Sequence, residues 1–314
     1  MIGLISLILP IFLLIALGFG AVRGRIIADG MAQAIAAFVM NFALPALILH
    51  ALLRQDFRET FNWAYVVAYG GGSVAAAFAV LLAGLLLVLR RPMPRAAMAA
   101  MGGCASNTGF VGFPVASLAV GAAALPALPL TILIENILVM PLAIVLAEAS
   151  TQEGRGALAT LRHTFARLVR TPMMMAIIVG VVLAAAGFRP PVAIARTMEM
   201  LSNAAVPCAL FVVGATLAGL KPGAAFQDVW LIALGKLVLH PLLVLGAFML
   251  VGGVPAELMT VGIILASAPM LTIYPIVAGR FGQAQMGAAA LLATTAISFF
   301  TLLAVLAMLG LAGP

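Results

Sequence analysis

The sequence contains an internal repeat, because residues 162 positions apart match along its two halves. The pairs at this shift are Pro10 and Pro172, Gly18 and Gly180, Asn41 and Asn203, and Pro45 and Pro207. After a slip of one residue the shift becomes 161, and the pairs are Pro94 and Pro255, Ala105-Ser106 and Ala266-Ser267, Phe113-Pro114 and Tyr274-Pro275, and Gly121 and Gly282. Two copies of one unit form two related bundles, and a site can form where they meet.

The apolar composition sets the class of each unit. Of the 314 residues, 65% are apolar and 8% are charged, which is too little polar surface for a soluble domain. A membrane-spanning helix needs about 20 predominantly apolar residues. Charged or Gly/Pro-rich breaks leave ten such segments, near 3–22, 31–53, 62–89, 95–121, 125–148, 168–187, 192–219, 226–251, 256–280 and 285–311. The runs do not alternate as barrel strands do, so we predict an all-α polytopic membrane protein with ten transmembrane helices.

Five segments per half is an odd number, so the second copy enters the membrane from the opposite side and the repeat is inverted. The repeats are then residues 1–148 and 168–314, joined by a connector at 149–167. The connections after the odd-numbered segments hold 11 Lys and Arg, against 4 on the other side. The richer side is predicted to be cytoplasmic, which places both termini outside the inner (plasma) membrane. The net charge of +7 reflects this topology, so no nucleic-acid partner is expected. The cytoplasmic connector is either a simple linker or a short amphipathic helix on the inner leaflet.

Segments four and nine contain the residues least compatible with a continuous helix. Segment four holds SNTGFVGFP at 106–114, and segment nine holds SAPMLTIYP at 267–275. Proline removes a backbone donor and glycine weakens a helix, so a continuous helix through Asn107–Pro114 is not expected. Irregular backbone at membrane depth is tolerated only where protein or a water-filled cavity satisfies it. Matching breaks in two inverted halves predict a transport site near the midplane.

Half-helix N-termini offer free N–H groups and a partial positive charge, which suit a carboxylate. The candidate substrate-binding residues are Asn107, Thr108, Gly109, Pro114, Ser267, Thr272 and Pro275. Ordinary kinked helices are the alternative, since Pro and Gly are frequent in membrane helices. Asn41 joins the candidates either as a substrate ligand or as an amide that bonds the carbonyl freed by Pro45.

Glu135, followed by Asn136, lies near the middle of segment five, and Lys236, with His240 one turn later, lies near the middle of segment eight. A charge at the bilayer centre costs about 3 kcal/mol, so such residues face the bundle interior and have partners. Glu135 and Lys236 could form a structural pair. Alternatively, Glu135 takes up a proton or a sodium ion while Lys236 or His240 attracts an anion. No metal site or other cofactor is expected.

Three stretches resemble the auxin efflux carrier family: Asn-Phe-Ala-Leu-Pro in segment two, Ser-Asn-Thr-Gly-Phe-Val-Gly-Phe-Pro in segment four, and Arg-Thr-Pro-Met at the start of segment six. That family includes plant auxin carriers and bacterial proteins described as malonate or malate permeases. The resemblance implies a scaffold of segments 1, 2, 6 and 7 and a moving transport domain of segments 3–5 and 8–10. It also implies that segments four and nine cross at their breaks, with Asn107, Pro114 and Pro275 beside the substrate. Sodium–bile acid symporters have a similar architecture, but segment nine offers no carboxylate around Ala268–Tyr274.

We therefore predict a secondary active transporter that moves a small organic anion, a carboxylate or an auxin-like acid, by alternating access. Coupling to protons or sodium stays open. The alternatives are a sodium-coupled symporter of the bile acid type and a channel, although no rings of like charge or repeated filter sequence appear. An enzyme is not expected, because the sequence lacks catalytic clusters such as HExxH. A scaffold that faces the lipid bilayer could support a homodimer.

Overall fold

The computed structural model describes residues 2–28, 30–54, 61–150, 162, 165–166, 169–220 and 226–311. Its helical runs are α1 (Ile2–Arg23); α2, η1 and α3 (Met31–Phe38, Val39–Ala43, Leu44–Arg54); α5, η2, α6 and η3 (Trp63–Gly70, Gly71–Phe78, Ala79–Ala83, Gly84–Val88); α7 (Met93–Cys104); η4, α8 and η5 (Thr108–Gly112, Phe113–Val120, Gly121–Ala124); α9, η6 and α10 (Ala127–Ile134, Glu135–Val139, Met140–Ala149); α12 (Pro172–Ala185); α13 (Val192–Gly219); α14, η7 and α15 (Phe226–Leu234, Gly235–Leu239, His240–Val251); α16 (Ala256–Ser267); α17 (Tyr274–Gly279); and α18 (Ala284–Met308). In this part of the chain every regular element is a helix, and the one β feature is an isolated bridge.

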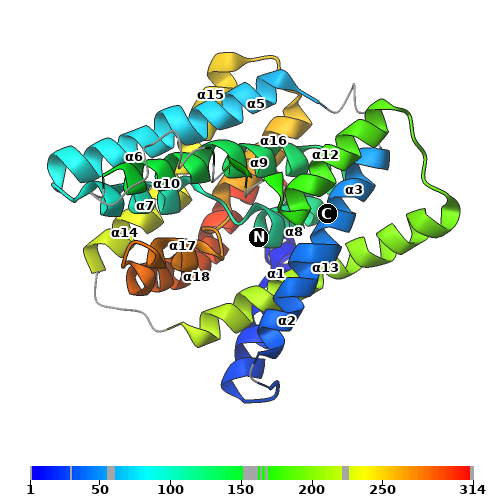
Figure 1. Cartoon of the computed structure of the whole chain (residues 1–314), viewed down its shortest axis with the longest axis horizontal. Coiled ribbons are helices and arrows are strands. Elements are labelled where there is room, and N and C mark those ends of the chain that lie inside the picture. The colour runs from blue at the N-terminus through cyan, green and yellow to red at the C-terminus, as the bar shows by residue number, and fades with distance from the viewer. Residues whose placement is uncertain are drawn as a thin grey trace.

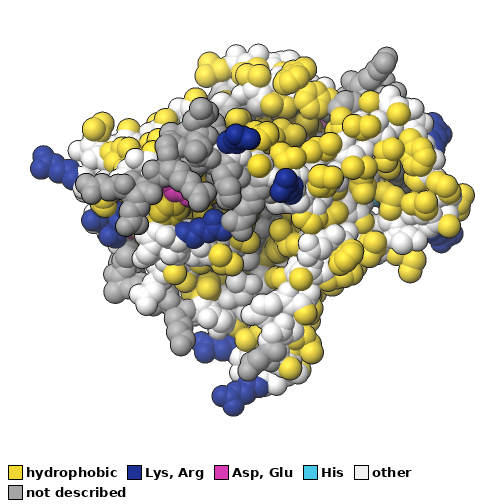
Figure 2. All heavy atoms as spheres, in the orientation of Figure 1, with side chains coloured by type: hydrophobic (Ala, Val, Ile, Leu, Met, Phe, Trp, Pro, Cys, Tyr) yellow, Lys and Arg dark blue, Asp and Glu magenta, His cyan; other side chains and the backbone are white. Residues whose placement is uncertain are grey.

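Among the described residues, six of the runs are long and apolar enough to cross a membrane, and four shorter apolar helices accompany them. Hydrophobic side chains spread over much of the visible described face, with Lys and Arg side chains in separate places among them (Figure 2). The structure is thus all-helical, as predicted, and agrees with a polytopic membrane protein. Most of the predicted connector at 149–167 lies outside the described residues, including His163.

One group of helices is built on the crossing of α1 and α13. A Cβ added to Gly18 would lie 2.0 Å from the carbonyl oxygen of Phe211, and one added to Gly214 would lie 1.8 Å from that of Ile15. Only glycine allows the two backbones to approach this closely. Helices α3 and α12 pack beside this crossing, with α2 along α13 (Figure 1).

The remaining helices pack into a second group. Helix α15 contacts α5, η2 and α16, while α7 contacts α10 and α18 contacts both α14 and α17. In Figure 1, α5, α6, α7 and α10 lie together on one side and the paired α1 and α13 on another. At one end of this group the buried Asp228 carboxylate accepts from Arg91 at 2.8 Å and Arg95 at 2.5 Å. This cluster ties the start of α14 to the residues around the start of α7.

Four π-helical turns explain how four of the helical runs tolerate an internal proline. Each turn ends two residues before a proline: η1 before Pro45, η4 before Pro114, η6 before Pro141 and η7 before Pro241. The residue before each proline bonds the carbonyl five positions back, as Phe113 N–H does to Thr108 O. The wider turn keeps the proline ring from the carbonyl it would meet in an α-helix, so the helix continues.

Candidate functional site

The two broken segments cross, and their backbones bond to each other. Helix α7 ends at Cys104 and the helix resumes at Thr108, while α16 ends at Ser267 and α17 begins at Tyr274. Between these ends, Asn107 N–H donates to Pro269 O at 2.8 Å, and Leu271 N–H donates to Ala105 O at 3.3 Å. The two breaks thereby satisfy backbone groups that neither could satisfy alone at membrane depth.

The position of the first break corrects one expectation. The chain leaves the helix at residues 105–107, and it is helical from Thr108 through Pro114 to Val120. The prediction that no continuous helix passes through Asn107–Pro114 is therefore wrong for all but Asn107, because the π turn accommodates Pro114. Pro275 lies in the first turn of α17, directly after the second break.

Glu135 joins the first break to the neighbouring helical run. Its carboxylate accepts a hydrogen bond from Ser106 N–H at 3.0 Å, and Thr108 Oγ1 donates to it at 2.8 to 2.9 Å. The side chain is buried, 6% exposed. Because the helix resumes at Thr108, the carboxylate lies at a helix N-terminus, whose partial positive charge stabilises an anion.

Lys236 lies at the opposite kind of helix end. Its Nζ donates to Ala266 O at 2.6 Å, at the C-terminus of α16, and contacts His240 Nδ1 at 3.1 Å. His240 Nε2 in turn lies 2.9 Å from Ser73 Oγ. When Lys236 is charged its ammonium only donates, so Nδ1 then accepts and the ring proton lies on Nε2, where it bonds the serine. Glu135 and Lys236 form no direct ion pair in the described part of the chain, so the pairing considered from the sequence is not made.

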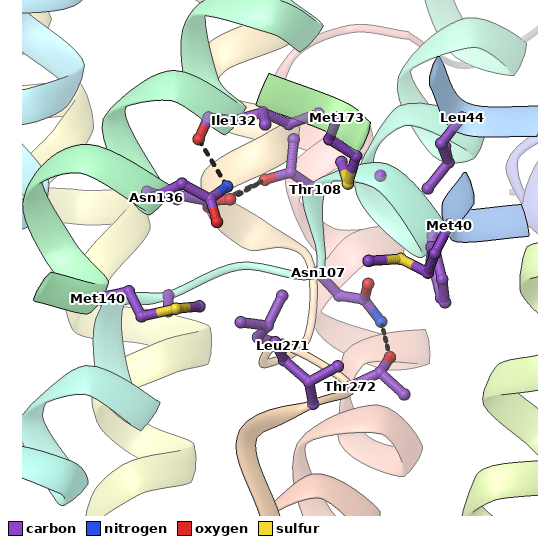
Figure 3. Close-up of a pocket in the computed structure, with 15 residues that line it drawn as sticks. Met40, Leu44, Asn107, Thr108, Ile132, Asn136, Met140, Met173, Leu271 and Thr272 are labelled. Atoms are coloured by element: carbon purple, nitrogen blue, oxygen red, sulfur yellow. Dashed lines mark hydrogen bonds between the residues drawn. The ribbon is translucent and has the colours of Figure 1, made fainter. Parts of the chain in front are cut away.

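A cavity of about 80 Å³ lies at the crossing. Its polar lining comes from Asn107, Thr108, Glu135, Asn136 and Thr272, and its apolar lining from Met40, Leu44, Ala105, Gly109, Phe110, Ile132, Met140, Met173, Leu271 and Ile273. Figure 3 shows the Asn107 amide directed at Thr272, with Met40 and Met140 on opposite sides. Asn107 Nδ2 donates to Thr272 Oγ1 at 2.6 Å, which connects the side chains of the two broken segments.

The cavity gathers six of the twelve candidate site residues: Asn107, Thr108, Gly109, Glu135, Asn136 and Thr272. The other candidates lie elsewhere. Ser267 is buried and donates to Ile263 O at 2.7 Å, and Lys236 and His240 form the separate network above. Asn41 faces outward and donates to Ala37 O at 2.7 Å. The expectation that the Asn41 side chain bonds the carbonyl freed by Pro45 is wrong. That carbonyl, four residues before Pro45, is the backbone carbonyl of Asn41 itself.

Other residues of the site were not predicted from the sequence. Met40, Leu44 and Met173 reach the cavity from the helix group around α1 and α13. They are apolar residues in apolar segments, so nothing in the pattern marks them. Ser73, the partner of His240, follows three glycines in a mostly apolar segment, and that polar position was a usable signal.

Comparison with known proteins gives three results. The profile of a family described as "Membrane transport protein" matches residues 4–306. A Rhizobium meliloti (strain 1021) protein named "Putative malonate transporter" is 30% identical over 302 residues, which cover 94% of this chain and 92% of the relative. The "Uncharacterized transporter YfdV" of Escherichia coli (strain K12) is 24% identical over 300 residues, which cover 93% of each. These names describe transport rather than catalysis.

Proposed function

The chain belongs to the membrane transport protein family, whose members resemble auxin efflux carriers, and from this premise we propose that it is a secondary transporter of a small dicarboxylate such as malonate. The observation that carries the proposal is the cavity at the crossing. Residues 108–110 at one half-helix N-terminus and Leu271 and Thr272 of the other break line it together. Free N–H groups and the helix dipole at such an end favour a carboxylate.

The size of the cavity supports a small substrate. Its 80 Å³ is well below the roughly 300–1,000 Å³ typical of sites for drug-sized ligands. An anion of a few heavy atoms fits this space better than a bile acid or another large ring system. The malonate named for the Rhizobium meliloti relative is of that size and carries two carboxylates.

Glu135 supplies a means of coupling. An ionised Glu135 carboxylate beside the cavity repels an anionic substrate, whereas a protonated one does not. Substrate and proton therefore bind favourably together, and the anion crosses with a proton. Sodium bound by the same carboxylate is the alternative, as in a symporter of the bile acid type.

The two helix groups support a mechanism of alternating access. We propose ten transmembrane helices in two inverted repeats, residues 1–148 and 168–314, with the cytoplasmic connector at 149–167 and both termini outside the inner membrane. Segments 1, 2, 6 and 7 form the scaffold, and segments 3–5 and 8–10 form the transport domain. The cavity has Met40, Leu44 and Met173 on the scaffold side, so a shift of the transport domain would open it to one side of the membrane or the other.

The test is uptake of radiolabelled malonate by protein reconstituted in liposomes. The Asn107 amide carries two N–H donors, of which Thr272 takes one. Removing the other from a bound carboxylate costs about 1.5–3 kcal/mol, a loss of roughly tenfold to a hundredfold in affinity. We expect this loss in Asn107→Ala.

The matched control is Asn41→Ala, which removes an amide that faces away from the cavity and bonds only a local carbonyl in the described contacts. It should transport like the wild type. Equal uptake by Asn107→Ala and the wild type would place the site elsewhere. Failure of the wild type to take up any small carboxylate under a proton or sodium gradient would refute the proposed function itself.

A further inference from the structure

A second cavity, of about 620 Å³, lies away from the crossing at the ends of α3 and α12 and the start of α13. Its polar lining is His50, Arg189, Arg196 and Glu199. The two arginines are exposed, so their guanidinium groups can reach a ligand from the surroundings. Neither the proposed transport site nor its coupling uses any of these residues.

The charge of this hollow is not explained by topology. In the proposed orientation, the side of the membrane that holds α12's last turn carries only four of the Lys and Arg residues, and two of them line this cavity. Basic residues are depleted on that side, so a pair in one hollow calls for a local cause. A guanidinium offers a planar fork of donors that matches phosphate or carboxylate oxygens, which favours an anionic ligand.

The surface beside the hollow is apolar. Val182 of α12 is 62% exposed, and Val192 and Met200 of α13 are 80% and 72% exposed. Apolar Leu53 and Phe188 also contribute to the lining of the hollow. A basic cavity at the end of membrane-spanning helices, flanked by side chains that face lipid, complements an amphipathic molecule with an anionic head.

We propose that this cavity binds the headgroup of an anionic phospholipid, with Arg189 and Arg196 on the phosphate and the acyl chains over the exposed side chains of α12 and α13. Glu199 opposes the phosphate charge and limits the affinity. The site is separate from the carboxylate site at the crossing, so it stands even if the transported substrate is different.

The test uses the full chain, purified in a zwitterionic detergent. Thermal unfolding is measured on addition of phosphatidylglycerol, or of phosphatidylcholine with the same acyl chains. Phosphatidylglycerol should raise the melting temperature of the wild type more than phosphatidylcholine does. Each basic residue near an anionic lipid contributes a similar favourable energy to binding. Arg189→Gln and Arg196→Gln should therefore each weaken the affinity for phosphatidylglycerol about fivefold. In the double variant, phosphatidylglycerol and phosphatidylcholine should raise the melting temperature equally.

Two controls accompany these variants. Arg280→Gln removes an exposed arginine after α17, away from the cavity, and should bind like the wild type. Glu199→Gln should bind phosphatidylglycerol more tightly. Thermal unfolding without lipid shows whether each variant is folded. If the arginine variants do not fold, Glu199→Gln still tests the site.

Three results would overturn the proposal. Equal stabilisation by the two lipids would remove the role of charge. An unchanged preference in the double variant would place the lipid elsewhere. A full shift produced by inorganic phosphate or by malonate at the same concentration would make the cavity a site for free anions rather than for a lipid.

Discussion

Replacing Glu135 by glutamine separates a coupling role from a structural one. The carboxylate accepts from Ser106 N–H and from the Thr108 hydroxyl, which has a single hydrogen to share between the two carboxylate oxygens. A glutamine oxygen can accept from both donors. The substitution therefore keeps the geometry and removes only the charge and the exchangeable proton.

The cost to stability follows from these two bonds. Hydrogen bonds to a charged group contribute about 1.5–3 kcal/mol and neutral ones about 0.5–1.5 kcal/mol, so the exchange loses about 1 kcal/mol per bond. Relief from burying a charge offsets part of that loss, and we expect Glu135→Gln to be destabilised by about 1–2 kcal/mol. Glu135→Ala leaves both donors without an acceptor, at about 1–3 kcal/mol each, and should unfold at a clearly lower temperature.

The assay compares two modes of transport in proteoliposomes. Exchange of external for internal malonate needs no net proton movement, so Glu135→Gln should retain it. Uptake driven by a pH gradient should fall at least about tenfold, because the amide cannot carry a proton. Glu148→Gln, further along the same helical run and outside the cavity lining, is the matched control. If Glu135→Gln still responds to the gradient as the wild type does, the carboxylate is not the coupling group and the reasoning fails.

Two further predictions concern stability. Gly214→Ala puts a methyl group 1.8 Å from Ile15 O, so α1 and α13 must separate. We expect this to lower the unfolding free energy by about 1–3 kcal/mol or more, which a lower melting temperature would show. An unchanged melting temperature would contradict the close crossing. Asp228→Asn removes the charge shared by Arg91 and Arg95. Since both arginines are partly exposed, we expect Asp228→Asn to lower the unfolding free energy by about 1–3 kcal/mol, less than the full cost of breaking a buried pair. Because salt screens the charges, 1 M salt should reduce the difference in melting temperature between wild type and variant.

The helical segments were predictable because each depends on local composition. The segment predicted at 192–219 is α13 as observed, and 226–251 is the run from α14 to α15. The course of the chain at Pro114 was not predictable in the same way. A proline normally stops an α-helix, and sequence does not indicate that a π turn before it lets the helix continue. The break was therefore placed a few residues too late.

The site was predictable where polar residues stand out in apolar segments. Asn107, Thr272 and Glu135 were marked by chemistry alone, and all three line the cavity. Their partners depend on how distant segments pack, which spacing does not encode. Lys236 therefore bonds the Ala266 carbonyl rather than Glu135, although both charges were expected to face the same interior.

The placement of the two buried charges indicates different duties for them. Lys236 neutralises the negative C-terminal end of α16, an end that would otherwise repel an anion at the crossing, and its bonds to Ala266 O and His240 hold it in place. Glu135 lies at a positive helix end and lines the cavity itself, where in the proposed mechanism its charge would act directly on the substrate. In the proposed mechanism, the Lys236 charge would make the crossing tolerant of anions, and the Glu135 carboxylate would change its charge as the substrate binds. It follows that loss of the Lys236 charge should weaken anion binding in both modes of transport, whereas loss of the Glu135 charge should affect only the coupled one.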